Sequence, residues 1–286
     1  MKLRFARPLF ILSFAIILLG SCNKNSLTPQ SQLPLFTLAS GQHYYGCIPS
    51  PPEALAAMPQ FMSLSSIAPL PTSIMLNHPP IGDQGSQGSC VGWAAVTTRS
   101  VAYNNTANQL AWNTGSDIFS AAYVYDQIKV GDCGSGSYET SALSLLKSQG
   151  VCVYNLMPYT DQSCSAMPDA GQKSNAANYK IQTAYNIPSY DINAIKYALS
   201  LKKPVMIAIM VDNLFESGGN ANHIWTPNTG SSIGGHAITI IGYDDSKQAF
   251  YVQNQWGANW GDHGFIWIAY NMFNLTNKVV EAHTID

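Results

Sequence analysis

The sequence predicts an α+β protein whose residues 70–286 form two lobes, a helical lobe followed by a lobe of antiparallel strands, with a cleft where they meet. The first half of this region places apolar residues three and four positions apart, the spacing of a helix face. The second half has short β-type runs separated by Gly, Asp and Asn. The region is long enough for one domain of two lobes.

Each expected element follows from a local pattern. A small-residue helix begins near Cys90, a second helix covers 117–129, and a third covers 141–149 and ends at Gly150, a usual left-handed cap. A fourth helix covers 191–200 and ends at Lys203-Pro204. The strands that we expect cover 205–211, 237–242, 249–253 and 265–268.

Residues 1–22 predict a lipoprotein signal peptide. Lys2, Arg4 and Arg7 form its basic start, and an apolar run over 9–19 is too short to span a bilayer comfortably. Leu19-Gly20-Ser21-Cys22 resembles a bacterial lipobox, so cleavage would leave Cys22 lipidated and the protein anchored to a membrane. The alternative is an ordinary secretory signal with an incidental cysteine. Either way we expect export, to the periplasmic or extracellular face of the bacterial cell envelope.

Residues 23–69 are rich in Ser, Pro, Gln and Gly, which predicts a spacer or short pro-segment before the main domain. A short helix is possible only around 53–58. Cys47 lies in the loop-like stretch Gly46-Cys47-Ile48-Pro49, which indicates that this part is held against something rather than free.

Composition excludes several classes of function. With 46% hydrophobic and 10% charged residues, the chain is globular. Its net charge is −2, and no Lys/Arg cluster occurs beyond the N-terminus, so nothing indicates nucleic acid binding. There is no Cys-x-x-Cys pair and the six histidines are scattered, so we expect no metal site. We also expect a monomer.

Cys90 is the candidate nucleophile. A Gly/Gln/Ser loop leads into the helix, so Cys90 falls near its first turn, where unpaired N–H groups and the helix dipole favour a thiolate. On this pattern alone, a buried structural cysteine is the alternative. Gln84, six residues upstream, offers a side-chain amide that could stabilise an oxyanion together with the Cys90 N–H.

This stretch resembles the papain-like cysteine peptidases, papain and the cathepsins, in which a Gln, five residues and then a Cys open the central helix. The chain departs from the family's Cys-Gly-Ser-Cys-Trp. It has Gln87 in place of the first cysteine, which removes a family disulfide, and Val91 in place of the tryptophan. The resemblance implies a papain-like two-lobe fold, a protein or peptide substrate and no cofactor.

The resemblance continues in the second half. Gly234-Gly235-His236-Ala237 resembles the setting of the family's catalytic histidine, and it opens an expected strand. Gln253-Asn254-Gln255-Trp256-Gly257 resembles the family's Asn-Ser-Trp-Gly element, with Gln255 in place of the serine. The resemblance therefore implies that His236 is the base and that Asn254 orients its ring.

An alternative orienter is Asp244 or Asp245, in the turn after the expected His236 strand, which would make a Cys-His-Asp enzyme of transglutaminase-like type. Both positions are at the wrong end of that strand to reach back, so surface acids are the preferred interpretation. Trp256 and Trp260 would shield the Asn254–His236 hydrogen bond from water, or simply be core aromatics.

Three residues are expected to bind substrate. Cys133-Gly134-Ser135-Gly136 resembles the family segment that pairs with the substrate main chain, with Gly136 allowing close approach, although a mobile turn fits the local sequence equally well. Ala237 occupies the family position that lines the site for the substrate's second side chain, which would leave room for an apolar group. Trp256 is the third.

Without Cys22 and Cys90, four cysteines remain, and they allow three pairings. Cys164 follows Pro158-Tyr159, which resembles a family motif, and Cys133 lies in the region that supplies its partner. The resemblance therefore favours a Cys133–Cys164 disulfide, which leaves Cys47 and Cys152.

The reaction that the resemblance implies is peptide-bond hydrolysis through a Cys90-His236-Asn254 triad and an acyl-enzyme, with Gln84 and the Cys90 N–H at the oxyanion. One alternative is a catalytically silent papain-like surface binding protein. Another is a Cys-dependent acyltransferase or transpeptidase that uses an amine in place of water.

Overall fold

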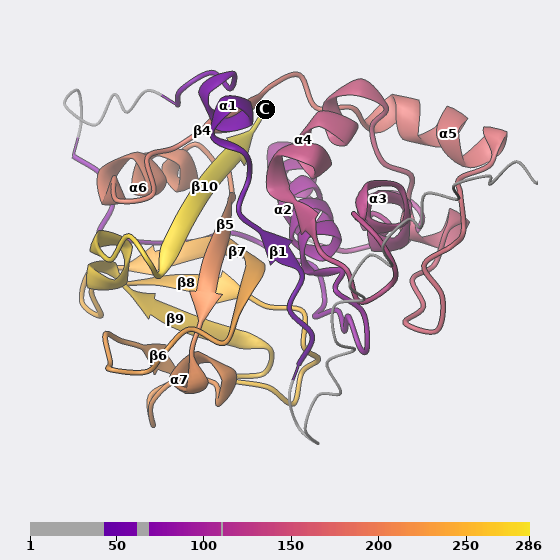
Figure 1. Cartoon of the computed structure of the whole chain (residues 1–286). Helices are drawn as coiled ribbons and strands as arrows, with labels where there is room; N and C mark the ends of the chain where they lie inside the picture. The colour runs from indigo at the N-terminus through magenta and orange to yellow at the C-terminus, as the bar shows by residue number, and fades with distance from the viewer. Residues whose placement is uncertain (1–42, 62–68, 110) are drawn as a thin grey trace, which may run out of the picture. The chain divides into compact units, whose positions relative to one another are not determined.

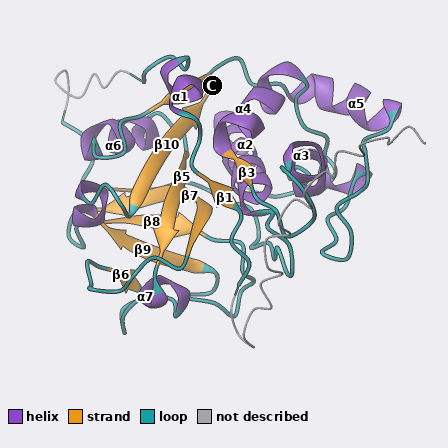
Figure 2. Ribbon diagram, in the orientation of Figure 1, coloured by secondary structure: helices purple, strands orange, loops and turns teal. Residues whose placement is uncertain are grey.

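A computed structural model describes residues 43–61, 69–109 and 111–286, all of which belong to one compact unit of the chain (Figure 1). The expected signal peptide, with Cys22, lies outside the described residues, as do 23–42 and 62–68 of the expected spacer. The α+β prediction is confirmed. Figure 2 shows helices α2 to α5 gathered on one side and the large sheet on the other.

The helical lobe is built around α2 (Cys90–Thr106), which packs on α3 and α4 on one side and on β7 on the other. Most of its residues are small, and 13 of the 17 are buried. At Gly92 an added Cβ would lie 2.9 Å from the Cβ of Tyr125, so glycine permits the close approach of α3. The other helices of the lobe are α3 (Ala121–Ile128), α4 (Glu139–Ser148) and α5 (Ala170–Ala176), with 3₁₀ turns at Tyr154–Leu156 and Ala177–Tyr179.

The beginning of the second helix was predicted wrongly. Helix α3 begins at Ala121, because the Ser120 hydroxyl caps it by accepting from the Tyr123 N–H at 3.0 Å. Asp117, the expected start, accepts from the Asn113 N–H at 2.6 Å and closes an earlier turn. Helix α4 begins two residues earlier than expected, and its cap is confirmed, since Gly150 has a φ of +84°.

Within the described residues, the second lobe is an eight-stranded sheet in the order β4-β10-β5-β7-β8-β9-β6, with β2 paired to β7. Its pairs are antiparallel except β6 with β9. Strands β5 and β8 match the prediction, whereas β7 is longer than expected at both ends. The strands are β2 (Ser73–Met75), β4 (Ala184–Asn186), β5 (Val205–Val211), β6 (Ile224–Trp225), β7 (Gly234–Asp244), β8 (Ala249–Gln253), β9 (Phe265–Ala269) and β10 (Val279–Ile285).

Two helices and a 3₁₀ turn belong with the sheet. Helix α6 (Ile192–Ser200) begins after Asp191, whose carboxylate caps it by accepting from the Ala194 N–H, so this predicted helix is confirmed. Helix α7 (Asn213–Glu216) follows β5, and a 3₁₀ turn covers Tyr270–Asn274. None of the helices in the described ranges is both long enough and apolar enough to cross a bilayer.

Residues 43–50 form a stretch that we call the N-terminal segment, and it runs between the two lobes. Figure 1 shows it in indigo, descending from α1 (Pro52–Ala56) past β1 (Cys47–Ile48), between β7 and the helices. Strand β1 pairs in parallel with β3 (Ser137–Tyr138) of the helical lobe and also contacts β7. The prediction that the chain around Cys47 is held in place is therefore confirmed.

The disulfide prediction is also confirmed: Cys133 and Cys164 are bonded. Among the described cysteines, Cys47, Cys90 and Cys152 are free and buried. The bond joins the glycine loop before β3 to the segment after Tyr159, so it fixes the part of the helical lobe on which the N-terminal segment rests.

Candidate active site

Cys90 is the first residue of α2 and is fully buried. Burial raises the pKa of its thiol to about 12, although the backbone N–H groups of Ala237, Gly46 and Val91 donate to Sγ and lower it. The expected position at the first helical turn is confirmed. In this structure, however, the loss of water raises the pKa of the thiol more than the backbone amides and the helix end lower it, so the thiol is neutral.

The register of the sheet brings His236 and Asn254 together. Thr239 of β7 pairs with Gln253 of β8, so continuing that antiparallel register sets His236 opposite Trp256 and close to Asn254. The His236 and Trp256 rings stack with centroids 4.4 Å apart. His236 Nε2 lies 2.8 Å from Asn254 Oδ1. Since Ala237 N–H donates to Cys90 Sγ, the same strand start lies against the thiol.

The hydrogen bond to Asn254 selects the tautomer of His236. Because an amide oxygen only accepts, Nε2 carries the proton and Nδ1 keeps a free lone pair. Nδ1 is buried and has no hydrogen-bond partner. Burial lowers the pKa of His236 to about 4, with the Asn254 bond acting in the opposite direction. The ring is therefore neutral and has an unused acceptor.

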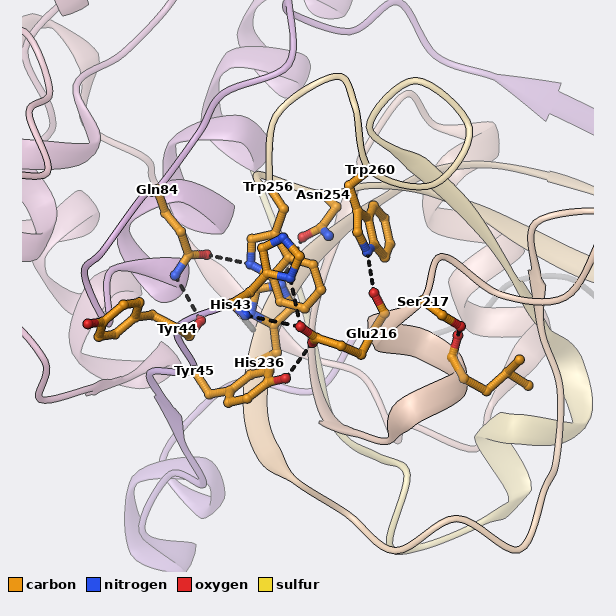
Figure 3. Close-up of polar contacts among 11 residues, drawn as sticks. His43, Tyr44, Tyr45, Gln84, Glu216, Ser217, His236, Asn254, Trp256 and Trp260 are labelled. Carbon is orange, nitrogen blue, oxygen red and sulfur yellow. Dashed lines mark hydrogen bonds and ion pairs between the residues drawn. The ribbon is translucent and has the colours of Figure 1, made fainter. Parts of the chain in front are cut away.

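Gln84 is buried with its amide held at both ends. Its Oε1 accepts from the Trp256 indole N–H at 3.1 Å, which fixes the orientation of the group. Its Nε2 donates to the carbonyl of Gln87 at 2.8 Å and to the carbonyl of Tyr44 at 3.0 Å. Figure 3 shows Gln84 presenting Nε2 to the Tyr44 carbonyl. A peptide carbonyl therefore already occupies the donor that we expected for an oxyanion.

The N-terminal segment covers the site from His43 to Gly46. The His43 ring lies flat on Trp256, with centroids 4.0 Å apart. The Gly46 N–H donates to Cys90 Sγ, and the Gly46 carbonyl accepts from the Ser137 N–H at 2.8 Å. An added Cβ on Gly46 would lie 1.9 Å from the Gly88 carbonyl oxygen, so only glycine fits there.

Two carboxylates of the sheet lobe hold this segment. Glu216, at the end of α7, accepts from the His43 N–H at 3.0 Å, from His43 Nδ1 at 2.8 Å and from the Tyr45 hydroxyl (Figure 3). Although burial opposes it, these hydrogen bonds lower the pKa of Glu216. Further along, Glu281 Oε1 accepts from the Ser50 N–H at 2.5 Å. The segment is thus anchored on both sides of Cys90.

The residues expected to bind substrate lie around the same segment. A Cβ on Gly136 would lie 2.2 Å from the Gly46 carbonyl oxygen, so this glycine does allow a peptide main chain to approach. Ala237 is buried, and its carbonyl accepts from Gln255 Nε2 at 2.8 Å. Trp256 lies between the rings of His236 and His43. Their roles toward a substrate remain predictions.

The alternative orienters lie elsewhere. Asp245 forms an ion pair with Lys196 at 2.8 Å, and Asp244 accepts from Ser246 within the turn. Asn254 is the residue that contacts His236.

Sequence reasoning missed the residues that cover and anchor the site. His43 and Tyr45 were assigned to a spacer, and nothing marked Glu216 out from other acids. Two signals were available. One is the aromatic cluster His43-Tyr44-Tyr45 in a stretch rich in small polar residues, and the other is the neighbouring Cys47, around which the chain was expected to be held in place.

Residues 75–283 match the family model described as papain family cysteine protease. The chain belongs to the papain family of cysteine proteases. Among curated relatives, cysteine proteinase COT44 of Brassica napus is 27% identical over 209 residues, covering 69% of this chain and 58% of the relative. Chymopapain of Carica papaya is 28% identical over 198 residues, covering 65% and 50%. The chain spans about half the length of the curated relatives that it matches.

Solved structures of the family share the fold. Xylellain, a cysteine protease from Xylella fastidiosa, superposes with a TM-score of 0.74 at 23% identity, covering 87% of this chain and 99% of xylellain. The bromelain protease from Ananas comosus, in complex with the E64 inhibitor, superposes with a TM-score of 0.60 at 22% identity, covering 76% and 99%. The papain-like two-lobe fold expected from the sequence is therefore confirmed.

The burial of Cys90 predicts an unreactive thiol. With a pKa of about 12 instead of 9, its thiolate fraction at pH 7.5 is lower by about 1,000-fold. We expect iodoacetamide to alkylate Cys90 in the intact chain about 1,000-fold more slowly than in urea-denatured chain, with the rate rising about tenfold per pH unit between pH 7 and 10. Mass-spectrometric peptide mapping reads Cys90 alone. Equal rates in native and denatured chains would contradict the geometry.

Proposed function

We propose that this protein is a cysteine peptidase that hydrolyses peptide bonds through Cys90, His236 and Asn254 by way of an acyl-enzyme. One observation supports this most strongly: a stretch of the chain's own peptide lies against Cys90, with a carbonyl at Gln84 Nε2. The site therefore binds main chain, and its polar groups suit acyl transfer.

The proposed chemistry uses the free acceptor of His236 and the side-chain donor of Gln84. His236 Nδ1, the free acceptor, takes the proton of Cys90, and Sγ attacks the substrate carbonyl carbon. The oxyanion accepts from Gln84 Nε2 and the Cys90 N–H. His236 then gives its proton to the leaving amine. Water, deprotonated by His236, adds to the thioester and releases the acid with the thiol restored.

The three departures from the family pattern leave the surroundings of Cys90, His236 and Asn254 intact, which argues against a catalytically silent binding protein. Gln87 Oε1 accepts from the Tyr159 hydroxyl at 3.1 Å and Nε2 donates to the Thr160 carbonyl at 3.2 Å, so this residue ties the loop down. Gln255 donates to Ala237 and lies beside His236. Val91 is buried in the helical core.

We also propose that residues 43–50 act as an inhibitory pro-segment. The Gly46 N–H lowers the pKa of the Cys90 thiol, while the Gly46 carbonyl is engaged by the Ser137 N–H, so the segment would lie over the thiol without being cleaved. It also removes water from Cys90 and His236, which keeps both groups neutral. The enzyme would be latent until the segment leaves the junction between the lobes.

Export and anchoring are proposed on the sequence of residues 1–22 and on the Cys133–Cys164 disulfide, which suits an oxidising compartment. Cells expressing the chain and fed radiolabelled palmitate should label it, and Cys22→Ala should abolish the label. Equal labelling of both chains would contradict the anchor.

Replacement of Cys90 tests the activity. In the full chain, Cys90→Ser should abolish both labelling by a peptidyl epoxide and cleavage of a fluorogenic dipeptide, because the nucleophile is lost. Gln84→Ala should lower kcat by about 100-fold through loss of an oxyanion donor. Cys152→Ser, a change at another buried free thiol, is the matched control and should keep both signals.

Other outcomes of this experiment would refute the proposal. Full cleavage by Cys90→Ala would exclude a Cys90 mechanism. Transfer of the acyl group to an added amine instead of water would identify an acyltransferase. Failure of the parent chain to react with probe or dipeptide, even after the segment is displaced, would identify a silent binding protein.

Weakening one anchor tests the latency. Glu216→Gln removes the charge that holds His43 and Tyr45, so we expect alkylation of Cys90 and dipeptide cleavage to rise about tenfold. Alkylation of Cys152 in the same sample should not change. Glu53→Gln, at an exposed residue of α1, is the control for the substitution. An unchanged Cys90 rate in Glu216→Gln would refute the anchor.

A further inference from the structure

A second group of ionisable side chains lies beside Cys90, beneath the N-terminal segment. We call it the acidic cluster. It consists of Glu139, the first residue of α4, and Glu281 and His283 of β10. All three are buried. His283 Nε2 lies 3.1 Å from Glu281 Oε2 and 3.5 Å from Glu139 Oε2, so two carboxyl groups share one imidazole.

The two carboxyl groups differ in their partners. Glu281 is engaged by His283 and by the Ser50 N–H, and these bonds lower its pKa although burial opposes them. Both oxygens of Glu139 are buried without a hydrogen-bond partner, and burial raises its pKa well above the usual range. No Lys or Arg forms an ion pair with any residue of the acidic cluster among the described parts of the chain. Glu139 therefore lacks a hydrogen-bond donor, and no Lys or Arg balances the two carboxyl groups of the acidic cluster.

Cys47 of the segment is buried and pairs with Ser137, two residues before Glu139 of the acidic cluster. Burial raises the pKa of its thiol, and the neighbouring acidic groups Glu139, Cys90 and Glu281 act in the same direction. Its neighbour Gly46 has its N–H on Cys90 Sγ, and Ser50 bonds Glu281 and Thr140. A peptide lying along residues 46–50 thus passes from the nucleophile directly onto the acidic cluster.

We propose that the acidic cluster recognises a cationic side chain, Lys or Arg, of a peptide bound across the site, at the position that Cys47 occupies in the N-terminal segment. Its N–H groups would donate to the free oxygens of Glu139, and its charge would balance the two carboxylates. The neutral thiol of Cys47 supplies neither N–H donors nor a positive charge, so the N-terminal segment leaves the acidic cluster without a cationic partner. This replaces the apolar preference that Ala237 had suggested.

The chain itself can test the recognition without any catalysis. Cys47→Lys places a cation over the acidic cluster, and Cys47→Met, of similar length but neutral, is the matched control for the added bulk. If a cation is recognised, the segment is held more tightly in Cys47→Lys. The rate at which iodoacetamide alkylates Cys90 in the intact chain at pH 7.5 measures this, since opening of the segment exposes the thiol and makes its ionisation easier.

We expect Cys90 to be alkylated about tenfold more slowly in Cys47→Lys than in Cys47→Met, the effect of one charge-assisted hydrogen bond. In a Glu139→Gln background the two rates should become equal. The rate at Cys152 shows in every sample whether the fold is kept. Equal rates in the two variants, or a faster rate in Cys47→Lys, would overturn the proposal. If Glu139→Gln does not fold, the comparison at position 47 alone decides.

The substrate part of the inference rests on the proposed peptidase function. Two fluorogenic dipeptides separate the cation recognition from the peptidase function. They differ only in their first residue, which precedes the residue at the cleaved bond and is either Arg or its neutral isostere citrulline. Arg should be favoured about tenfold in kcat/KM, and Glu139→Gln with Glu281→Gln should bring the ratio near one. Coverage of the site by the N-terminal segment lowers kcat/KM for both dipeptides by the same factor, so it cancels in the ratio of the two values.

The outcomes are distinguishable. Equal cleavage of both dipeptides would overturn the recognition and leave the peptidase function standing. Cleavage of neither, also in the Glu216→Gln chain whose segment is loosened, would refute the peptidase function, while the comparison at position 47 would still decide the recognition. A rise in Tm of the parent chain with Zn²⁺ alone, absent in Glu139→Gln, would show that the acidic cluster holds a metal ion instead and would overturn the proposal.

Discussion

The exclusion of water from Cys90 and His236 is the constraint on which the rest of the site depends. Desolvation penalises both charged forms, so it moves the two pKa values apart, to about 12 for the thiol and about 4 for the imidazole. A thiolate–imidazolium pair is therefore disfavoured while residues 43–50 are in place. The segment thus lies over two groups that are both neutral in this structure, the Cys90 thiol and the His236 imidazole.

The positions of these groups come from ordinary packing. Helix α2 is buried between the other helices and β7 because its residues are small, which fixes Cys90 at the junction of the lobes. The β7–β8 register sets His236 beside Trp256 and Asn254. Trp256 then orients Gln84 through its indole N–H. One aromatic side chain thus contacts both His236 and Gln84.

Local patterns were enough to predict much of the fold. The apolar runs of β5 and β8 were placed correctly, because continuous apolar residues bounded by turns leave little choice. The start of α3 was missed, since Asp117 and Ser120 both suit a helix cap and only the tertiary contacts of Asp117 decide between them. Cys90 was a candidate from its local loop-to-helix pattern, whereas the roles of His236 and Asn254 came from the resemblance to a family, because no local rule relates residues so far apart.

The course of the N-terminal segment was out of reach for a physical reason. A short stretch without periodicity takes its place from distant partners, such as Glu216 for His43 and Ser137 for Gly46. The acidic cluster escaped notice similarly. A search for metal-ligand spacings covers neighbours in sequence, whereas Glu139 and His283 meet only through folding.

The titration of His236 tests the central claim most directly. In the intact chain with ¹³C-labelled histidine, NMR should give His236 a pKa near 4, because its ring is buried beneath the segment, and the ring should remain neutral at pH 6. A Gly46→Trp chain, in which the segment cannot seat against Gly88, should show this pKa move upward. A His236 pKa near 6.5 in the intact chain, unchanged in Gly46→Trp, would contradict the account.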